Sequence, residues 1–377
     1  MQRRAFLKSL SALPIVAYLP SLVSAQQLAD QKLLILIQFG GGNDSLNMCV
    51  PYTNDAYYDA RGNLAISAQE TIPLTLDIGL NPVMSTLLEA WDSADLGVIQ
   101  GLGYPDPNRS HFRSIEIWQT ASDADEYAHL GWLNQLLPES DFPLQGVMIS
   151  GSPATLSGEP NQFSLNSNDT QTLVAIPDGT AATSAVQHIL NQRHIYNSAV
   201  ELLNDAFEQD IVLSTEFAGD GFSQDCKLVA EVLAAGVRPH VLHLSLGSFD
   251  THSNQRAPHD NLLEQLASGL SALRSELQAL GLWQQVTIAT YSEFGRRVAA
   301  NGSNGTDHGT AASHLVMGGS IKGGVYGQSP SLTNLDNGDL IFTQDFRDYY
   351  RTLADWMQWS PSDEIKEFAN LGFLHES

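Results

Sequence analysis

The chain has 377 residues, of which 43% are hydrophobic and only two are cysteines. The length and the apolar fraction exclude a disordered chain, and the size and cysteine count exclude a small disulfide-stapled domain, so we expect one large globular core. The 42 acidic residues against 18 basic ones give a net charge of −24, which disfavours nucleic acid and anionic lipid as partners and attracts divalent cations, although the acidity could equally serve solubility in salt.

The first 25 residues have the features of an export signal. Arg3 and Arg4 precede Phe6-Leu7-Lys8, and a short apolar run ends in the small-x-small cleavage pattern Val23-Ser24-Ala25. The run is too short and too interrupted by proline to span a membrane, so no stable membrane insertion is expected. The paired arginines resemble the bacterial twin-arginine (Tat) signal. That resemblance implies the Tat translocase as a transient partner, a periplasmic or cell-surface location, and a ligand loaded before export.

Residues 26–377 predict a single α/β domain. Five apolar runs are typical of buried strands, namely Leu33–Phe39, Leu96–Gln100, Val241–Leu246, Val286–Tyr291 and His314–Met317. Helical periodicity marks Asp225–Ala235, Asp260–Leu280 and Asp348–Trp359. This alternation predicts a mostly parallel central sheet covered by helices on both faces, with ligands bound beyond the carboxyl ends of the strands. Residues 150–183 are rich in small polar side chains and predict an insertion or lid.

Acidic and histidine side chains recur near the ends of the predicted strands. They and their polar neighbours are Asn43, Asp44, Asp250, His252, Glu293, Arg296, Asp307 and His308. Carboxylates and neutral imidazoles are ligands for divalent metals such as Zn, Mn, Mg or Ca. Any one of these residues alone could be a turn, cap or core residue, but the recurrence after three separate strands favours a metal or anion site. The run Gly40-Gly41-Gly42 lacks P-loop spacing and is interpreted as a tight turn beside Asp44 or as a plain glycine turn.

A candidate nucleophile precedes a predicted helix after Leu96–Gln100. Arg109, Ser110 and His111 stand at the start of this helix. A hydroxyl there lies at the positive end of the helix dipole, which would stabilise an alkoxide and receive a phosphate or sulfate oxygen. Ser110 could equally be only an N-cap. Cys49 and Cys226 could pair in an oxidising compartment or remain two independent buried thiols.

Several motifs together resemble one bacterial family. Residues 40–60, NRSHF, FDTHSNQ, SEFGRR and GTDHG are similar to the domain of unknown function 1501 family, over essentially the whole mature chain. That family is in turn similar to the alkaline phosphatase superfamily of phosphatases, phosphodiesterases, sulfatases and phosphomutases. The resemblance therefore implies an alkaline-phosphatase-like fold with metal ligands after the strands.

The resemblance also implies roles for individual residues. Asp44, Asp250, Asp307 and His308 match metal-ligand positions, and either Ser110 or His111 matches the position of the nucleophile. Three departures argue against a two-zinc site and favour one metal or an altered pair. Glu293 replaces an aspartate, Phe294 replaces a histidine, and His252 lies two rather than four residues beyond Asp250. No Cys-x-Pro-x-Arg context is present, so formylglycine sulfatase chemistry is not expected.

Two functions remain open. The first is an exported metal-dependent hydrolase of phosphate or sulfate esters, acting on a small anionic ester or on a sulfated or phosphorylated polymer. The metal ligands in this hypothesis are Asp44, Asp250, His252, Glu293, Asp307 and His308. Ser110, His111 or a water would act in catalysis, and Arg109, Arg296 and Asn43 would bind the substrate. The second is a non-catalytic secreted or cell-envelope binding protein with a degenerate cation site.

Overall fold

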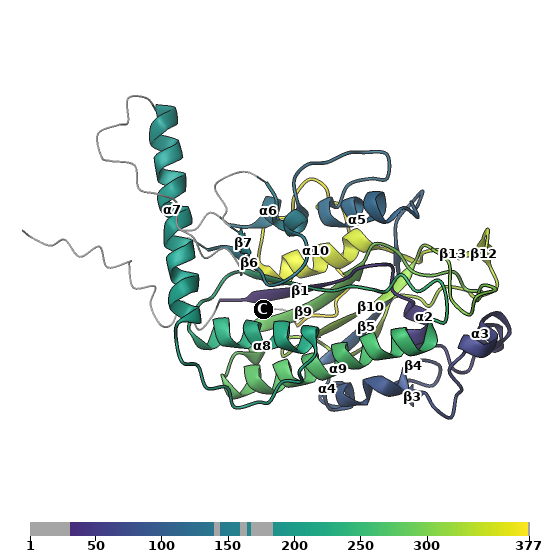
Figure 1. Ribbon diagram of the computed structural model, residues 1–377. Helices are drawn as coiled ribbons and strands as arrows, with labels where there is room; N and C mark the ends of the chain where they lie inside the picture. Colours follow the sequence, from purple (N-terminus) through teal and green to yellow (C-terminus); the bar gives the residue numbers. More distant parts are fainter. Residues whose placement is uncertain (1–30, 139–143, 159–163, 167–183, 376–377) are drawn as a thin grey trace, which may run out of the picture. The chain divides into compact units, whose positions relative to one another are not determined.

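Strand β1 (Leu33–Phe39) lies inside a nine-stranded sheet in the computed structural model, which describes residues 31–138, 144–158, 164–166 and 184–375 (Figure 1). The contacts between residues group Lys32–Ser377 as one unit. The predicted export signal at 1–25 lies outside the described residues, as does most of the predicted insertion at 150–183. No helix in the described ranges is long and apolar enough to cross a membrane.

The central sheet is mostly parallel, as the sequence predicts. In spatial order its strands are β11 (Gly324–Tyr326), β5 (Leu96–Gly103), β10 (Ala312–Gly318), β9 (Val286–Ser292), β1, β8 (Val241–Leu246), β6 (Gly146–Met148) and β7 (Ser164–Asn166), with β14 (Gln344–Asp345) also paired to β5. β1 pairs in parallel with β8 and β9 on its two sides. Because both of its edges are paired and both of its faces are covered, β1 can be a nearly continuous apolar run.

The reversed direction of β10 decides which residues reach the functional edge. β10 pairs antiparallel with both β9 and β5, so the segment that precedes it lies at the carboxyl ends of the parallel strands. Asp307 and His308 belong to that segment and arrive at this edge although they come before their strand. His314 lies within β10 and is fully buried, so it stays in the core.

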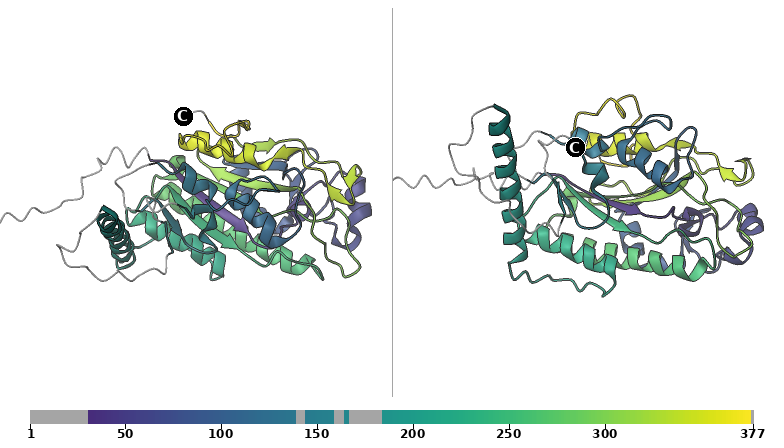
Figure 2. Two further views of the ribbon diagram at one scale, coloured as in Figure 1. Left: turned by 90° about the horizontal axis from the view of Figure 1, so that it is seen from above. Right: turned by 45° about the horizontal axis from the view of Figure 1, so that its top comes forward.

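Helices cover both faces of the sheet, which confirms the predicted fold class (Figures 1 and 2). The helices are α2 (Ser45–Met48), α3 (Asp55–Arg61), α4 (Leu88–Asp92), α5 (His111–Thr120), α6 (Trp132–Leu136), α7 (Ser184–Phe207), α8 (Gly221–Ala234), α9 (Arg256–Ala279) and α10 (Phe346–Met357). Alternate residues of β1 point to opposite faces. Ile35 and Ile37 belong to the core cluster of α8 and α9, whereas Leu34 and Leu36 belong to the cluster of α5, α6 and α10.

Short elements complete the described structure. The 3-10 helices are η1 (Gly62–Leu64), η2 (Pro82–Leu87), η3 (Pro153–Leu156) and η4 (Trp283–Gln285). Two small sheets consist of β2 (Cys49–Val50), β3 (Ile72–Pro73) and β4 (Gly79–Leu80), and of β12 (Leu335–Asp336) and β13 (Asp339–Leu340). Cys49 and Cys226 are separate buried thiols, and burial raises the pKa of Cys49 to about 12.

The predicted helices exist, but their amino ends lie earlier than expected. α8 begins at Gly221 because the side chain of Asp220 accepts a hydrogen bond from the backbone N–H of Ser223. α10 begins at Phe346 because Asp345 caps it in the same way through Arg347. In both cases the apolar periodicity marks the buried face, while the capping carboxylate sets the start of the helix.

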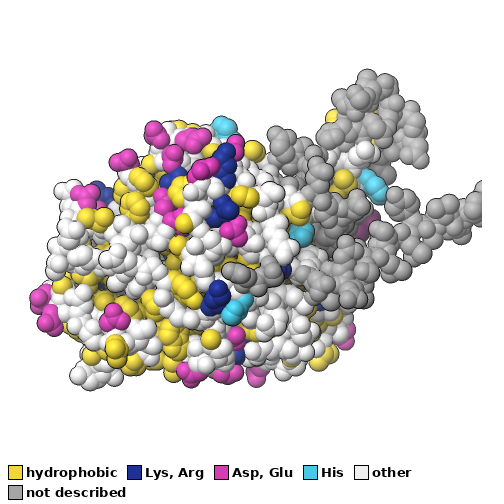
Figure 3. All heavy atoms as spheres, turned by 180° about the vertical axis from the view of Figure 1, so that it is seen from behind, with side chains coloured by type: hydrophobic (Ala, Val, Ile, Leu, Met, Phe, Trp, Pro, Cys, Tyr) yellow, Lys and Arg dark blue, Asp and Glu magenta, His cyan; other side chains and the backbone are white. Residues whose placement is uncertain are grey.

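Acidic side chains are spread over the face of the molecule drawn in Figure 3, in keeping with the net charge of −24.

Candidate metal centre

Loops from four parts of the chain meet at the carboxyl ends of the parallel strands. Asp250 and His252 follow β8, and Glu293 follows β9. His308 precedes the reversed strand β10, and His111 is the first residue of α5 after β5. The topology therefore brings together acids and imidazoles from positions that are up to about two hundred residues apart in the sequence, as expected for open α/β sheets.

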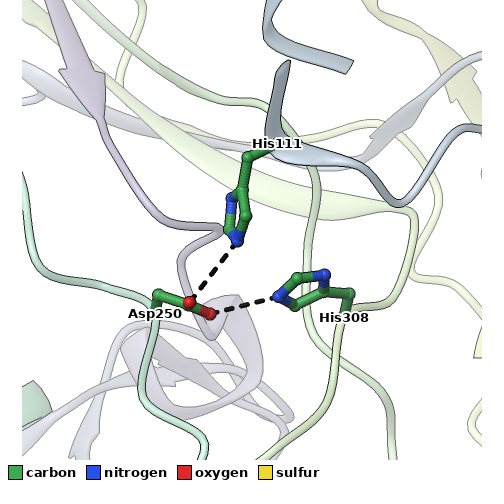
Figure 4. A group of neighbouring side chains, drawn as sticks. All are labelled: His111, Asp250 and His308. Carbon is green, nitrogen blue, oxygen red and sulfur yellow. Dashed lines mark hydrogen bonds and ion pairs between the residues drawn. The ribbon is translucent and has the colours of Figure 1, made fainter. Parts of the chain in front are cut away.

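His111, Asp250 and His308 form the centre of this cluster (Figure 4). One ligand atom from each of the three residues lies within 4.8 Å of the other two. The Nε2 atom of His308 is 3.1 Å from Oδ1 of Asp250, and the Nε2 atom of His111 is 3.5 Å from Oδ2. The side chain of Asp250 is 45% exposed, so a ligand can reach the carboxylate from solvent.

His252 adds a second imidazole beside the same carboxylate. Its Nε2 atom lies 2.9 Å from Oδ1 of Asp250 and 2.9 Å from Nε2 of His308. Its Nδ1 atom lies 3.2 Å from Oδ1 of Asp307. Three of the predicted ligands, Asp250, His252 and His308, thus lie in mutual contact, and Asp307 lies behind His252.

The outer nitrogens of the three histidines all face oxygen atoms. Nδ1 of His111 lies 2.7 Å from Oε1 of Glu293, and Nδ1 of His308 lies 2.9 Å from the carbonyl oxygen of Arg109. Nδ1 of His252 faces the Asp307 carboxylate. When each ring is neutral and directs its Nδ1 hydrogen to that oxygen, it presents a lone pair at Nε2.

Those lone pairs converge on a negatively charged carboxylate, which fits a bound cation. Nε2 of His111 is buried and makes no hydrogen bond within the described part of the chain. Acceptor atoms gathered without hydrogens between them repel one another, and a shared positive ion removes that repulsion. Imidazole and carboxylate donors are suitable ligands for Zn²⁺ or Mn²⁺.

Asp250 is held in its charged form. Burial by itself would raise the pKa of this carboxyl, but the hydrogen bond from Arg296 and the charge of that guanidinium lower it to about 2. The pKa of Asp307 is also lowered, chiefly by the hydrogen bond from Asn301. Both carboxylates therefore stay ionised over the whole physiological pH range.

Glu293 lies behind His111, away from Asp250. It is 3% exposed, and its Oε1 atom accepts hydrogen bonds from the backbone N–H of Gly41 and from Nδ1 of His111. The sequence suggests Glu293 as a metal ligand. The structure places its carboxylate on Nδ1 of His111, where a carboxylate can fix the orientation and tautomer of a histidine ring.

The side chain of Arg296 is buried next to Asp250. Its side chain is 0% exposed, and its nitrogens donate to the carbonyls of Gly41, Gly42, Phe249 and Thr306 and to Oδ1 of Asp250. The sequence suggests Arg296 as a substrate clamp. In the structure its donors are used to tie the loops after β1 and β8 to the segment before β10, so it has no exposed donor for a substrate.

Asp44 and Asn43 also lie in the buried layer, apart from the central three residues. Asp44 is 1% exposed, and its carboxylate forms a two-point ion pair with Arg61 and accepts from Gln255. Burial would raise the pKa of Asp44, but Arg61 outweighs this effect and lowers it. Oδ1 of Asn43 lies 2.9 Å from Nε2 of His259. The structure thus places both side chains in internal contacts, outside the group of His111, Asp250 and His308.

Sequence reasoning missed Arg61, which is fully buried at the end of α3. The signal that could have found it is Asp44 itself. A buried carboxylate beyond the end of a strand needs a cation or several hydrogen bonds, so a buried partner for Asp44 was to be expected, although its position in the chain was not.

Ser110 and Arg109 form the rim of the cluster. Ser110 is the exposed N-cap of α5, but its hydroxyl makes no capping hydrogen bond. Its backbone N–H donates to Oδ1 of Asn108 at 2.8 Å. Arg109 is 46% exposed and pairs with Asp339 at 3.1 Å. The ring of Phe294 packs 4.9 Å from that of His111 and 4.7 Å from that of His308, measured between ring centroids.

The chain matches one protein family in sequence and several solved structures in fold. The sequence profile of a family described as protein of unknown function (DUF1501) matches residues 90–347. No curated protein matches the chain in sequence. The C-terminal periplasmic domain of EcEptC from Escherichia coli, in complex with Zn, is similar in structure with 10% identity, a TM-score of 0.44, and coverage of 93% of this chain and 89% of that chain.

Two further solved structures are similar to a comparable degree. The phosphonate monoester hydrolase from Silicibacter pomeroyi has 10% identity and a TM-score of 0.46, covering 91% of this chain and 76% of that chain. A protein in the alkaline phosphatase superfamily from Vibrio parahaemolyticus has 12% identity and a TM-score of 0.43, covering 91% of this chain and 70% of that chain.

Proposed function

The chain belongs to the family described as protein of unknown function (DUF1501), and from this premise and the geometry of the cluster we propose that it is an exported metal-dependent hydrolase of phosphate or sulfate esters. The observation that carries the proposal is the convergence of His111, Asp250 and His308 within 4.8 Å of one another. This cluster lies at the start of α5, where Ser110 is exposed.

Four residues are proposed to hold the divalent ion. They are His111, Asp250, His252 and His308. Three nitrogen donors favour Zn²⁺ or Mn²⁺ over Mg²⁺ or Ca²⁺, which prefer oxygen ligands. When bound, such an ion neutralises the charge of an anionic ester and lowers the pKa of a hydroxyl or water next to it. Glu293 and Asp307 are proposed to orient His111 and His252 through their outer nitrogens.

Ser110 is the proposed nucleophile, with a water molecule as the alternative. Its hydroxyl makes no capping hydrogen bond to α5, and the first N–H groups of that helix supply partial positive charge beside it. The oxygen would bond to phosphorus or sulfur as the bond to the alcohol breaks, and the serine proton would leave on the alcohol. Water would then cleave the serine ester, which releases phosphate or sulfate and returns a proton to the Ser110 oxygen. Arg109 is proposed to contact the anionic oxygens, because its side chain remains 46% exposed beside Ser110.

Metal analysis and an ester panel test this proposal. The purified protein is expected to bind about one divalent ion per chain and to hydrolyse at least one of a nitrophenyl phosphate, a phosphodiester and a nitrophenyl sulfate. Asp250→Ala and His308→Ala should abolish that activity, and unchanged turnover in both variants would overturn the assignment. Ser110→Ala should lower kcat by roughly a thousandfold or more at unchanged metal content if Ser110 attacks, and should leave kcat nearly unchanged if water does.

Export through the Tat translocase is a separate part of the proposal. It rests on the paired Arg3 and Arg4 followed by an apolar run and a cleavage pattern. Replacing both arginines by lysine should retain the precursor in the cytoplasm of a bacterial host, as measured by cell fractionation. Normal export of that variant would contradict a twin-arginine route.

A second candidate function is non-catalytic binding of an anionic ligand through the cation. Two observations favour it, namely the apolar ring of Phe294 beside the cluster and the enclosure of Arg296, which leaves few cationic donors for a substrate. A protein that holds its metal and binds phosphate, but hydrolyses no ester in the panel, would select this function.

A further inference from the structure

A cavity of about 200 Å³ lies beside the proposed metal centre. Its walls come from the connection between β5 and α5 and from the segment around β13. The apolar and aromatic side chains in its lining are Tyr104, Pro107, Phe294, Leu340, Ile341 and Phe342. The volume is sufficient for one group of the size of an aromatic ring.

Two residues connect this cavity to the proposed reaction site. Phe294 lines the cavity and packs against the rings of His111 and His308. Asn108 also lines the cavity, and its side chain accepts the backbone hydrogen bond of Ser110. An ester that reacts at Ser110 would therefore lie next to a residue of the cavity wall.

The charges of the lining select against anions. It contains three carboxylates, those of Asp106, Asp336 and Asp339, and no basic side chain. Asp339 is paired with Arg109 at 3.1 Å and with Arg297 at 3.3 Å. Asp106 and Asp336 are exposed residues of the lining, so their negative charge would repel a second anionic group at this place.

We propose that this cavity holds the alcohol portion of the substrate and that this portion is apolar and not anionic. The substrate class would then be a phosphate or sulfate ester of an aryl or bulky alkyl alcohol, and not a polymer with a second anionic group next to the reacting ester. This inference rests on the proposed function for the position of the ester. The cavity itself can be tested without any reaction.

Binding of phosphonates that cannot be hydrolysed tests the position of the alcohol portion. Phenylphosphonate, methylphosphonate and 4-carboxyphenylphosphonate are titrated calorimetrically into the zinc-loaded full chain. The phenyl compound should bind about tenfold or more tighter than the methyl compound, because its ring leaves water. The carboxyphenyl compound should lose that advantage, and Asp106→Asn with Asp336→Asn should restore it severalfold.

A matched pair of variants locates the effect. Ile341 lines the cavity and is 43% exposed, so Ile341→Trp fills the cavity without entering the core. Val212 is 89% exposed and outside the cavity lining, so Val212→Trp adds the same ring elsewhere. Ile341→Trp should abolish the preference for phenyl, and Val212→Trp should keep it. Equal binding of the phenyl and methyl compounds by the unmodified protein would overturn the proposal.

A second probe separates the cavity from the proposed function. The fluorine NMR line of 4-fluorophenol, which carries no phosphate, should broaden with the unmodified protein and with Val212→Trp, but not with Ile341→Trp. Broadening without phosphonate binding or ester hydrolysis would mean that the cavity takes an apolar group while the proposed function fails. The absence of broadening, or equal broadening with Ile341→Trp, would overturn the cavity assignment.

Discussion

The Nε2 atoms of His252 and His308 lie 2.9 Å apart, and each lies about 3 Å from the same oxygen of Asp250, at 2.9 and 3.1 Å respectively. When both imidazoles are neutral and carry their hydrogens on Nδ1, which faces another oxygen in each ring, no hydrogen remains between these three atoms. The arrangement is relieved by a metal ion or by added protons, and these two compete for the same positions.

Metal binding should therefore release protons. Calorimetric titration of Zn²⁺ at mildly acidic pH, in buffers of different ionisation enthalpy, should show heats that vary with the buffer, and affinity should rise with pH. Asp250 contributes little to this dependence, since its pKa is already lowered to about 2. Heats independent of the buffer, with an affinity that does not change between acidic and neutral pH, would contradict a histidine-bound ion.

Asp250→Asn should lower metal affinity by at least about a hundredfold, because it removes the only carboxylate among the four proposed ligands. Equilibrium dialysis against Zn²⁺ measures the effect. Asp92→Asn is a suitable control because Asp92 is an exposed acid at the end of α4, outside the cluster. Similar affinities in the two variants would show that the ion binds elsewhere.

Glu293→Gln should weaken metal binding by about tenfold to a hundredfold, less than the loss of a ligand. The amide keeps the size of the side chain but no longer fixes the hydrogen on Nδ1 of His111. Glu116→Gln serves as the control, since Glu116 lies on α5, the helix that begins with His111, and its carboxylate pairs with Arg113 outside the cluster. If the loss equals that of Asp250→Asn, Glu293 is itself a ligand, as the sequence suggests.

Arg61→Met should destabilise the protein by about 3–5 kcal/mol at neutral pH, because it leaves the buried charge of Asp44 unpaired. Urea unfolding measures this cost. The folded chain lowers the pKa of Asp44, so the stability that this carboxylate contributes is present above the ordinary aspartate pKa and is lost as pH falls through the folded value. The cost of Arg61→Met should shrink in acid and should be smaller when Asp44→Asn is combined with it. A cost that does not change with pH would contradict this account.

Gly42→Ala should disturb the cluster more than a matched glycine substitution. Gly42 has a φ of 75°, and an added Cβ would come within 2.3 Å of the ring of Phe294. Gly281 has a φ of 71°, and an added Cβ would meet nothing within 4 Å. Gly281→Ala should lower the free energy of unfolding by about 1 kcal/mol, because alanine is strained at this backbone conformation. Gly42→Ala should lower the free energy of unfolding by about 1–3 kcal/mol more than Gly281→Ala does, and it should also lower zinc affinity. Equal effects of the two substitutions on stability and on zinc affinity would exclude a role for the close approach of Gly42 to Phe294.

The central sheet could be predicted from the sequence because its strands are continuous apolar runs. Leu33–Phe39 and Val241–Leu246 match the observed strands in both ends. Short strands such as β6 and β11 have three residues each and no pattern that distinguishes them from loops. Their pairing depends on the neighbouring strand, which local sequence does not report.

The positions of acidic residues after several strands predicted that they would lie at one edge of the sheet, but not how deeply each would be buried. Asp44, Asp250 and Glu293 all follow strands, yet one is paired with Arg61, one is half exposed, and one lies behind His111. These differences arise from which cation or hydrogen-bond donor reaches each carboxylate. That information resides in the packing of distant segments, so spacing along the chain could not supply it.

Arg296 gives the loops of the cluster a permanent positive charge of their own. Since its contacts to Gly41, Phe249 and Thr306 involve only the protein, the scaffold of the loops after β1 and β8 does not depend on an added ion. The apo form should therefore keep its native conformation, and ions should exchange at a preorganised surface. Which metal occupies the protein would then be decided by the ions available in its surroundings and not by the act of folding.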